Sequence, residues 1–155
     1  MSDSYTVDTN IVVTLNRDQP RDVYPSVWQA LERLIAEGRC FMSREAYEEL
    51  VKVDDECAPW AKAQSGLVQE ATDEELAVVN TITNQHPGWV QETLNAADPF
   101  IIAQAVEQEF VVVAFEKRKG QGTADRNLRI PNVADEWEVQ CVTFQELARR
   151  EGWVF

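Results

Sequence analysis

Basic residues are scarce in this chain of 155 residues, in which 14 Lys and Arg stand against 27 Asp and Glu and the formal net charge is −13. Phosphate contacts need clustered Lys and Arg, so this charge argues against a protein that coats nucleic acid over its whole surface. Cysteines are few as well. Cys40, Cys57 and Cys141 lie outside any metal-ligand spacing, which disfavours a disulfide scaffold or a zinc module.

Long apolar runs are missing too. No stretch approaches the run of about 20 apolar residues that would span a bilayer. The first four residues lack the basic and apolar regions of a signal peptide, so we expect a cytoplasmic protein with no membrane partner. With 45% hydrophobic and 26% charged residues the composition is globular, and residues 1–155 are predicted to form a single domain.

Apolar segments and amphipathic segments alternate along the chain. The clearest strand, 110–115, is continuous, apolar and β-branched. Further strands are expected at 4–8, 40–42, 67–68 and 139–143. Helices are expected at 11–13, 25–38, 43–53, 55–64, 72–84, from 98 onward and at 144–150. This alternation predicts an α/β fold, a three-layer α/β/α sandwich around a mostly parallel sheet.

Acidic residues occupy special places in this pattern. Asp8 ends the first strand and Glu116 ends strand 110–115, so both are expected at the sheet edge where ligands bind in open parallel sheets. Asp98 starts a helix and shares one helical stripe with three apolar residues, Ile101, Ile102 and Ala105. The stripe aims its carboxylate at the core, although a helix-capping role for Asp98 is an alternative interpretation.

A further acid comes from the helix at 43–53. Glu49 flanks the apolar face of that helix beside Ala46 and Val53, whereas Glu45 and Glu48 are expected to point further toward water. Exposed glutamates are common on helices, so an ordinary surface position is the alternative for Glu49.

Together the four acids predict a metal site. Carboxylates that converge on one edge repel each other unless they are protonated or bridged by a cation, and all-oxygen ligation selects Mg²⁺ or Mn²⁺. Such an ion activates water for attack on a phosphodiester. The candidate metal ligands and catalytic residues are Asp8, Glu49, Asp98 and Glu116.

A basic, glycine-containing segment follows Glu116 directly. Within 117–129 five bases face a single acid, and Gly120 and Gly122 favour a mobile loop. A solvated surface is the ordinary interpretation of such a charge run. Its position beside the acids instead makes five residues candidates for gripping an RNA backbone: Lys117, Arg118, Lys119, Arg126 and Arg129.

The turn at 86–88 contains the only histidine. His86 precedes Pro87 and Gly88, so a turn residue is expected there rather than a general base. Trp89 follows the turn and is a candidate for exposure at a dimer or partner surface.

Several short segments in this order resemble a PIN domain: Tyr5–Asn10, Glu49–Leu50, Ala97–Ala103 and the Val-rich strand that precedes Glu116. Two more segments are similar to signatures of a PIN-like subfamily of bacteria and archaea: Tyr24–Trp28 and Asp54–Glu56. The resemblance covers residues 4–153. It implies an α/β/α sandwich with a metal-dependent endoribonuclease site.

Carried over by position, the resemblance makes Asp8, Glu49, Asp98 and Glu116 the four acids of that site, with Thr9 and Asn10 supporting the first. Many family members are VapC-type toxins that are dimeric and held inactive by a protein antitoxin, so an RNA substrate, an antitoxin and a homodimer are expected. This chain departs from the family's Thr-x-Asp signature, because it has Ala114-Phe115-Glu116. The alternative is a catalytically inactive PIN-like protein that acts as a protein-binding or regulatory module.

Overall fold

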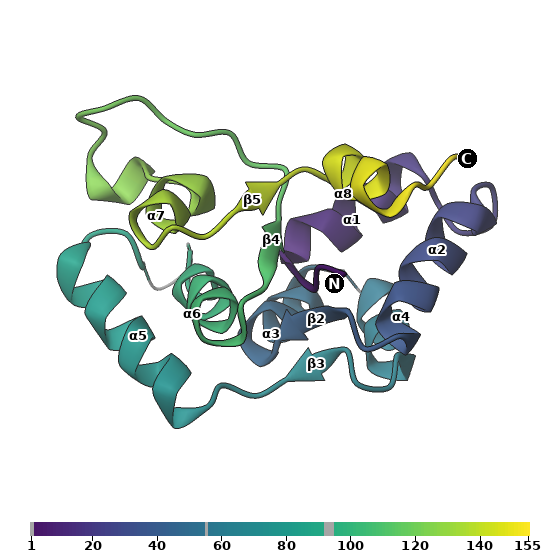
Figure 1. Ribbon diagram of the computed structural model, residues 1–155, viewed down its shortest axis with the longest axis horizontal. Helices are drawn as coiled ribbons and strands as arrows, with labels where there is room; N and C mark the ends of the chain where they lie inside the picture. Colours follow the sequence, from purple (N-terminus) through teal and green to yellow (C-terminus); the bar gives the residue numbers. More distant parts are fainter. Residues whose placement is uncertain (1, 55, 92–94) are drawn as a thin grey trace.

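In the part of the chain that the structure describes, five short strands form an all-parallel sheet at the centre of the protein (Figure 1). The structure is a computed structural model, and it describes residues 2–54, 56–91 and 95–155. Across the sheet the strand order is β3-β2-β1-β4-β5. The strands are β1 (Tyr5–Val7), β2 (Cys40–Ser43), β3 (Val68–Gln69), β4 (Val111–Val113) and β5 (Cys141–Val142).

Eight α-helices in the described ranges cover this sheet. They are α1 (Thr9–Asp18), α2 (Pro25–Ala36), α3 (Arg44–Val53), α4 (Cys57–Ala63), α5 (Asp73–Gln85), α6 (Asp98–Gln108), α7 (Ile130–Glu136) and α8 (Phe144–Glu151). In Figure 1, α5, α6 and α7 lie on one side of the strands, and α1, α2, α4 and α8 lie on the other. The predicted three-layer α/β/α sandwich is therefore confirmed. No helix within these ranges is long and apolar enough to cross a membrane.

The helix starts follow from local sequence. Ser43 accepts a hydrogen bond from the backbone N of Ala46 at 3.2 Å and caps α3, while Thr72 caps α5 in the same way. The segment Thr72-Asp73-Glu74-Glu75 has the sequence of a capping box, but only this half of the box forms among the described residues. The carboxylate of Glu75 turns inward and accepts a hydrogen bond from Gln108 on the neighbouring α6.

Some elements differ from the sequence expectation. The helix expected at 11–13 is the longer α1, which starts directly after Asp8. The strand expected at 110–115 pairs only over β4, because its neighbour β1 ends where α1 begins. Helix α7 forms in a stretch without a predicted helix, and its apolar residues are buried. The helix expected at 55–64 is α4, and Asp55 lies outside the described residues.

The central position of β1 is what places the site. Chain connections run from β1 outward through β2 to β3 on one side, and β4 and β5 follow on the other side. The strand order therefore changes direction between β1 and β4. In open α/β sheets, ligands bind beyond the carboxyl ends of the strands at this switch point.

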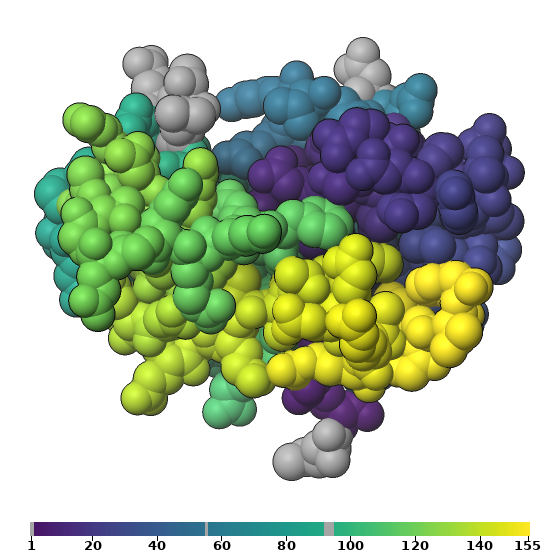
Figure 2. All heavy atoms as spheres, turned by 90° about the horizontal axis from the view of Figure 1, so that it is seen from above, coloured from purple at the N-terminus to yellow at the C-terminus, as the bar shows by residue number. Residues whose placement is uncertain are grey.

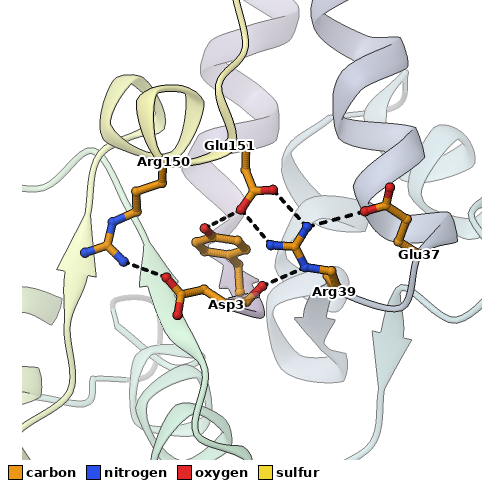
Figure 3. A network of polar contacts seen from close by, with 6 residues as sticks. Asp3, Glu37, Arg39, Arg150 and Glu151 are labelled. Atoms are coloured by element: carbon orange, nitrogen blue, oxygen red, sulfur yellow. Dashed lines mark hydrogen bonds and ion pairs between the residues drawn. The ribbon is translucent and has the colours of Figure 1, made fainter. Parts of the chain in front are cut away.

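A polar network ties the opposite end of β1 to the last helix (Figure 3). The hydroxyl of Tyr5 donates to Glu151 Oε2 at 2.7 Å, and the guanidinium of Arg39 donates to both oxygens of Glu151 at 2.8 and 2.7 Å. The Nε of Arg39 also donates to the backbone oxygen of Asp3. These bonds join the start of β1, the residue before β2 and the end of α8.

We predict that Glu151→Gln destabilises the protein at pH 7 by about 1–3 kcal/mol, because it removes the closer and more buried of the two acidic partners of a half-buried guanidinium. Hydrogen bonds from Arg39 lower the pKa of Glu151, so this stabilisation is present above the ordinary glutamate pKa and is lost as the pH falls through the lowered value. Urea unfolding of both proteins between pH 3 and pH 8 measures the difference.

Glu70→Gln is the matched control, because Glu70 is an exposed glutamate 3.8 Å from Arg44. It should change the free energy of unfolding by less than about 0.5 kcal/mol. An equally small change in Glu151→Gln would show that the network does not hold α8 to the sheet.

Candidate functional site

A cavity of about 430 Å³ lies beyond the carboxyl ends of β1 and β4. Figure 2 shows α1 (purple), the region of α3 and α4 (blue) and the chain after β4 (green) meeting on this face of the molecule. The four predicted acids all line the cavity: Asp8, Glu49, Asp98 and Glu116. The remaining lining residues are Thr9, Asn10, Lys52, Val53, Asn95, Ala96 and Arg129. The structure thus brings together four acids from distant parts of the chain.

Asp8 lies at the floor of the cavity and is only 2% exposed. Its backbone N donates to the oxygen of Val113 at 3.0 Å, which fixes it at the junction of β1 and β4. Within the described residues, Oδ2 of its carboxylate is buried without a hydrogen-bond partner. Burial, followed by the charges of Glu116 and Glu49, raises the pKa of Asp8 to about 7, although the backbone N–H groups of Thr9 and Asn10 oppose the rise.

Asp98 is the first residue of α6, and the N-cap position belongs to Ala97. Among the described residues no hydrogen bond joins its side chain to the start of the helix, and it is 6% exposed, so the capping interpretation is wrong and the inward aim is confirmed. Burial and the charges of Asp8, Glu116 and Glu49 raise its pKa well above the usual range, and the charge of Arg129 opposes that rise.

Glu49 reaches the cavity from α3 and is half-buried. Its Oε1 accepts a hydrogen bond from the backbone N of Ala97 at 3.1 Å, directly before Asp98. The predicted apolar face of α3 is wrong at one position, Val53, which is 65% exposed at the end of the helix. Glu48 is exposed as expected, whereas Glu45 is half-buried and does not line the cavity.

Glu116 lies three residues beyond the end of β4, not at the end of the strand as predicted. Its Oε2 accepts a hydrogen bond from the backbone N of Ile130 at 3.0 Å. The carboxylate therefore joins the segment after β4 to the start of α7. The glutamate side chain is one methylene longer than that of an aspartate, which extends its reach toward α7.

The two residues after Asp8 have different surroundings. Thr9 is buried, and its hydroxyl donates to the backbone oxygen of Ala46 at 2.8 Å, which joins α1 to the helix that carries Glu49. Asn10 is exposed and lines the cavity. Thr9 thus positions two of the acids relative to each other.

The basic segment 117–129 is more structured than the expected mobile loop. It contains a 3₁₀ turn at Asp125–Asn127, and Arg118 makes a two-bond ion pair with Asp135 at 2.7 and 2.9 Å. The backbone N of Lys119 donates to Asn132. Among the five predicted RNA-binding bases, only Arg129 is in the described cavity lining, and Lys117 and Arg126 are exposed elsewhere in the segment.

The turn at 86–88 anchors that segment. Trp89 is fully buried and donates from Nε1 to the backbone oxygen of Leu128 at 3.0 Å, so the expected exposed surface at Trp89 is wrong. His86 ends α5, and its ring nitrogens lie 2.9 Å from Asp125 and 2.6 Å from Glu136. Partial burial lowers the pKa of His86, but the hydrogen bonds to Glu136 and Asp125 raise it more, and the net shift is upward.

Two polar lining residues, Lys52 and Asn95, are absent from the sequence prediction. Lys52 lies three residues after Glu49 on α3, and this helical spacing alone could have indicated it. Asn95 has a backbone φ of 62°, a left-handed conformation that asparagine tolerates better than most residues. Its Nδ2 donates to the oxygen of Trp89, and its own backbone oxygen accepts from the N of Asp98. No local sequence pattern predicts this turn.

The chemistry of the lining fits a hard divalent cation. Its titratable donors are carboxylates, with no His or Cys among the described lining residues, and the buried Oδ2 of Asp8 lacks a partner. Within residues 2–54, 56–91 and 95–155, no three His, Cys, Asp or Glu side chains are already grouped as a metal site. Glu49 and Glu116 are each held by a backbone N–H, which keeps the four like charges apart.

The fold and this cavity define the class: an α/β/α protein with a carboxylate cluster at the switch point of a parallel sheet. Comparison with protein families gives a match over residues 5–155 to one described as a domain of unknown function (DUF4411). The chain belongs to this family. No curated protein matches it. The family description names no activity, so the function has to be argued from the site itself.

We predict that Asp8→Asn stabilises the metal-free protein at pH 8 by about 1–3 kcal/mol, because it removes a buried and repelled charge. The raised pKa means that folding favours the protonated carboxyl, so Asp8 costs stability as the pH rises toward and through about 7. Urea unfolding in EDTA at pH 5 and pH 8 tests this. The exposed Asp22→Asn is the control, and a variant less stable than the wild type at pH 8 would contradict the prediction.

For His86→Gln we expect a loss of about 0.5–1.5 kcal/mol at pH 6, because both acidic partners of the ring are part-exposed and screened by solvent. The pKa of His86 is raised on folding, so its contribution is present below the ordinary histidine pKa and disappears as the pH rises through the raised value. The difference in unfolding free energy should therefore shrink between pH 6 and pH 9. A difference that grows over this range would refute the assignment.

Proposed function

We propose that this protein is a metal-dependent endoribonuclease of the PIN type. The observation that carries the proposal is one cavity in which four carboxylates meet at the switch point of the sheet, with the Oδ2 of Asp8 buried and unpartnered among the described residues. Carboxylates gathered in this way require protons or a cation. The order of acidic motifs along the chain, which resembles that of PIN domains, supports a nuclease over other metal-dependent enzymes.

In this proposal Asp8, Glu49, Asp98 and Glu116 hold Mg²⁺ or Mn²⁺. Such an ion, when bound, activates a water molecule and offsets the charge on a phosphodiester. Asp8 and Asp98 set the position of the cation, because both are held in buried elements. Thr9 keeps α1 and α3 in register, so Asp8 and Glu49 face the same point.

RNA would approach along the basic segment. Lys117 and Arg126 are exposed there, and Arg129 lines the cavity itself. Arg118 and Lys119 line a second hollow together with Asn132 and Asp135. We therefore assign to them only contacts with RNA beyond the cleaved bond. A flexible single strand suits this arrangement, because its backbone can bend into a cavity on the protein surface.

We extend the proposal to the toxin of a toxin–antitoxin pair, acting in the cytoplasm as a homodimer. The support is the resemblance of the sequence to VapC-type proteins. The net charge of −13 adds to it, because an acidic surface favours a basic protein partner such as an antitoxin tail.

We predict that the purified protein cleaves single-stranded RNA with Mg²⁺ or Mn²⁺, and that Asp8→Asn and Asp98→Asn each lower the rate at least about 1,000-fold. Each substitution removes a proposed metal ligand without changing the size of the side chain. The measurement is gel-resolved cleavage of a labelled RNA, together with the rise in melting temperature that Mn²⁺ causes in each protein.

Glu48→Gln is the matched control for Glu49→Gln, because Glu48 is exposed on the same helix and does not line the cavity. Glu49→Gln should lose activity and Glu48→Gln should keep it. Full cleavage in EDTA or in Asp98→Asn would exclude the mechanism. A folded wild type that neither cleaves RNA nor gains stability from Mn²⁺ would favour the alternative, a catalytically inactive PIN-like binding module.

A further inference from the structure

Two basic side chains line the otherwise acidic cavity. Lys52 comes from α3, one turn beyond Glu49, and Arg129 directly precedes α7. Lys52 thus comes from the helix that carries Glu49, and Arg129 precedes Ile130, whose backbone N donates to Glu116. Nothing in the metal-binding role of the acids requires these two bases.

The two bases differ in their pairing from the arginines that acids hold in place. Arg39 and Arg118 are each engaged by a carboxylate through two hydrogen bonds. For Lys52 and Arg129, the described residues provide no ion pair with an acid within 4.0 Å. Four neighbouring carboxylates line the same cavity, so two cations that form no close pair there are available to an incoming anion.

The net charge of the cavity lining affects when such an anion can enter the cavity. Four carboxyl groups and two basic groups line the cavity, so its acids outnumber its bases by two. A phosphodiester is repelled by an excess of negative charge. One divalent cation would offset this excess over the lining as a whole, so metal binding would favour the entry of a phosphate.

The backbone around Arg129 is held more firmly than an exposed arginine needs. Its N donates to Asn132 Oδ1 at 3.1 Å, and the N of Ile130 donates to Glu116 at 3.0 Å. The Cα of Arg129 is therefore tied to one of the proposed metal ligands. A guanidinium can offer two parallel N–H groups to phosphate oxygens, whereas a lysine ammonium acts as a point charge on a flexible stem.

We propose that Arg129 and Lys52 form a two-sided phosphate clamp over the carboxylate site, an inference that rests on the proposed nuclease function. Arg129 binds the non-bridging oxygens of the phosphodiester that is cleaved. Lys52 binds a neighbouring phosphate of the same strand. The substrate class is thus a single-stranded polyphosphodiester with at least two adjacent phosphates in the cavity.

The test uses the full-length protein and a fluorescein-labelled single-stranded RNA, with variants Arg129→Gln, Arg129→Lys and Lys52→Gln. Single-turnover cleavage in Mn²⁺ measures the chemical step, and fluorescence anisotropy in Ca²⁺ at several salt concentrations measures binding. Two exposed bases away from the cavity serve as matched controls: Lys62→Gln on α4 and Arg149→Gln on α8.

We expect Arg129→Gln to lower the cleavage rate at saturating RNA about 100-fold, the scale for losing one positioned donor to developing charge. The cleavage rate of Arg129→Lys should stay below about a tenth of the wild-type rate, because a point charge cannot replace the two hydrogen bonds of a guanidinium. Lys52→Gln should instead weaken RNA binding about 10-fold. The slope of binding affinity against salt concentration should fall by the amount expected for about one phosphate contact. The cleavage rate at saturating RNA should stay within about threefold of the wild-type rate. Both controls should match the wild type.

The two readouts separate this proposal from the nuclease proposal. If the wild type binds RNA without cleaving it, the nuclease function fails, and the clamp stands only if Arg129→Gln and Lys52→Gln both weaken binding relative to the controls. Variants that bind and cleave like the controls would overturn the clamp while leaving the nuclease intact. A wild type that neither binds nor cleaves RNA would overturn both, and full recovery in Arg129→Lys would overturn the two-pronged role of Arg129.

Discussion

Mutual repulsion among buried carboxylates is the constraint on which the arrangement of this protein depends. Asp8 and Asp98 are almost fully buried, and their charges act on each other and on Glu49 and Glu116. A chain tolerates this only if other interactions hold the acids in place. Here β1 and its neighbour β4 are fixed by parallel pairing, and α6 is anchored by a stripe of buried apolar residues. The free energy gained by burying the apolar core therefore offsets the unfavourable electrostatic free energy of the cavity.

Backbone hydrogen bonds distribute the acids around the cavity. Glu49 accepts from Ala97, at the start of the helix that carries Asp98, and Glu116 accepts from Ile130. Each glutamate thus joins its own segment to another wall of the site. The polar network at the opposite end of β1, built on Glu151, stabilises the sheet from the other side. A cavity with more acids than bases lies at one end of β1, and paired charges lie at the other.

The part of the site that the sequence predicts is the part with local causes. An aspartate after a β-branched segment and an aspartate at the head of an apolar helical stripe are local patterns, and both side chains are buried in the cavity as expected. Strand order is not local, so the adjacency of β1 and β4 could only be inferred from the general behaviour of parallel sheets. The prediction of a mobile loop at 117–129 was wrong for the same reason. The glycines and polar residues of this segment indicate a mobile loop, but the residues that anchor it, His86 and Trp89, each lie 39 residues before their partners in the chain.

The fourth acid of the cavity lies beyond its strand. Pairing of β4 stops at Val113 and Glu116 follows three residues later, and its side chain reaches one methylene further than that of an aspartate. The longer side chain of Glu116 meets the backbone N of Ile130, and Arg129 is the residue directly before it. A carboxylate and a guanidinium in one cavity are thereby joined through a single peptide unit. A ligand that drew Glu116 inward would also act on the backbone beside Arg129, so the cation binding and the phosphate binding that we propose would be mechanically linked. Such a link would let a strongly acidic protein accept a phosphate at one place on its surface.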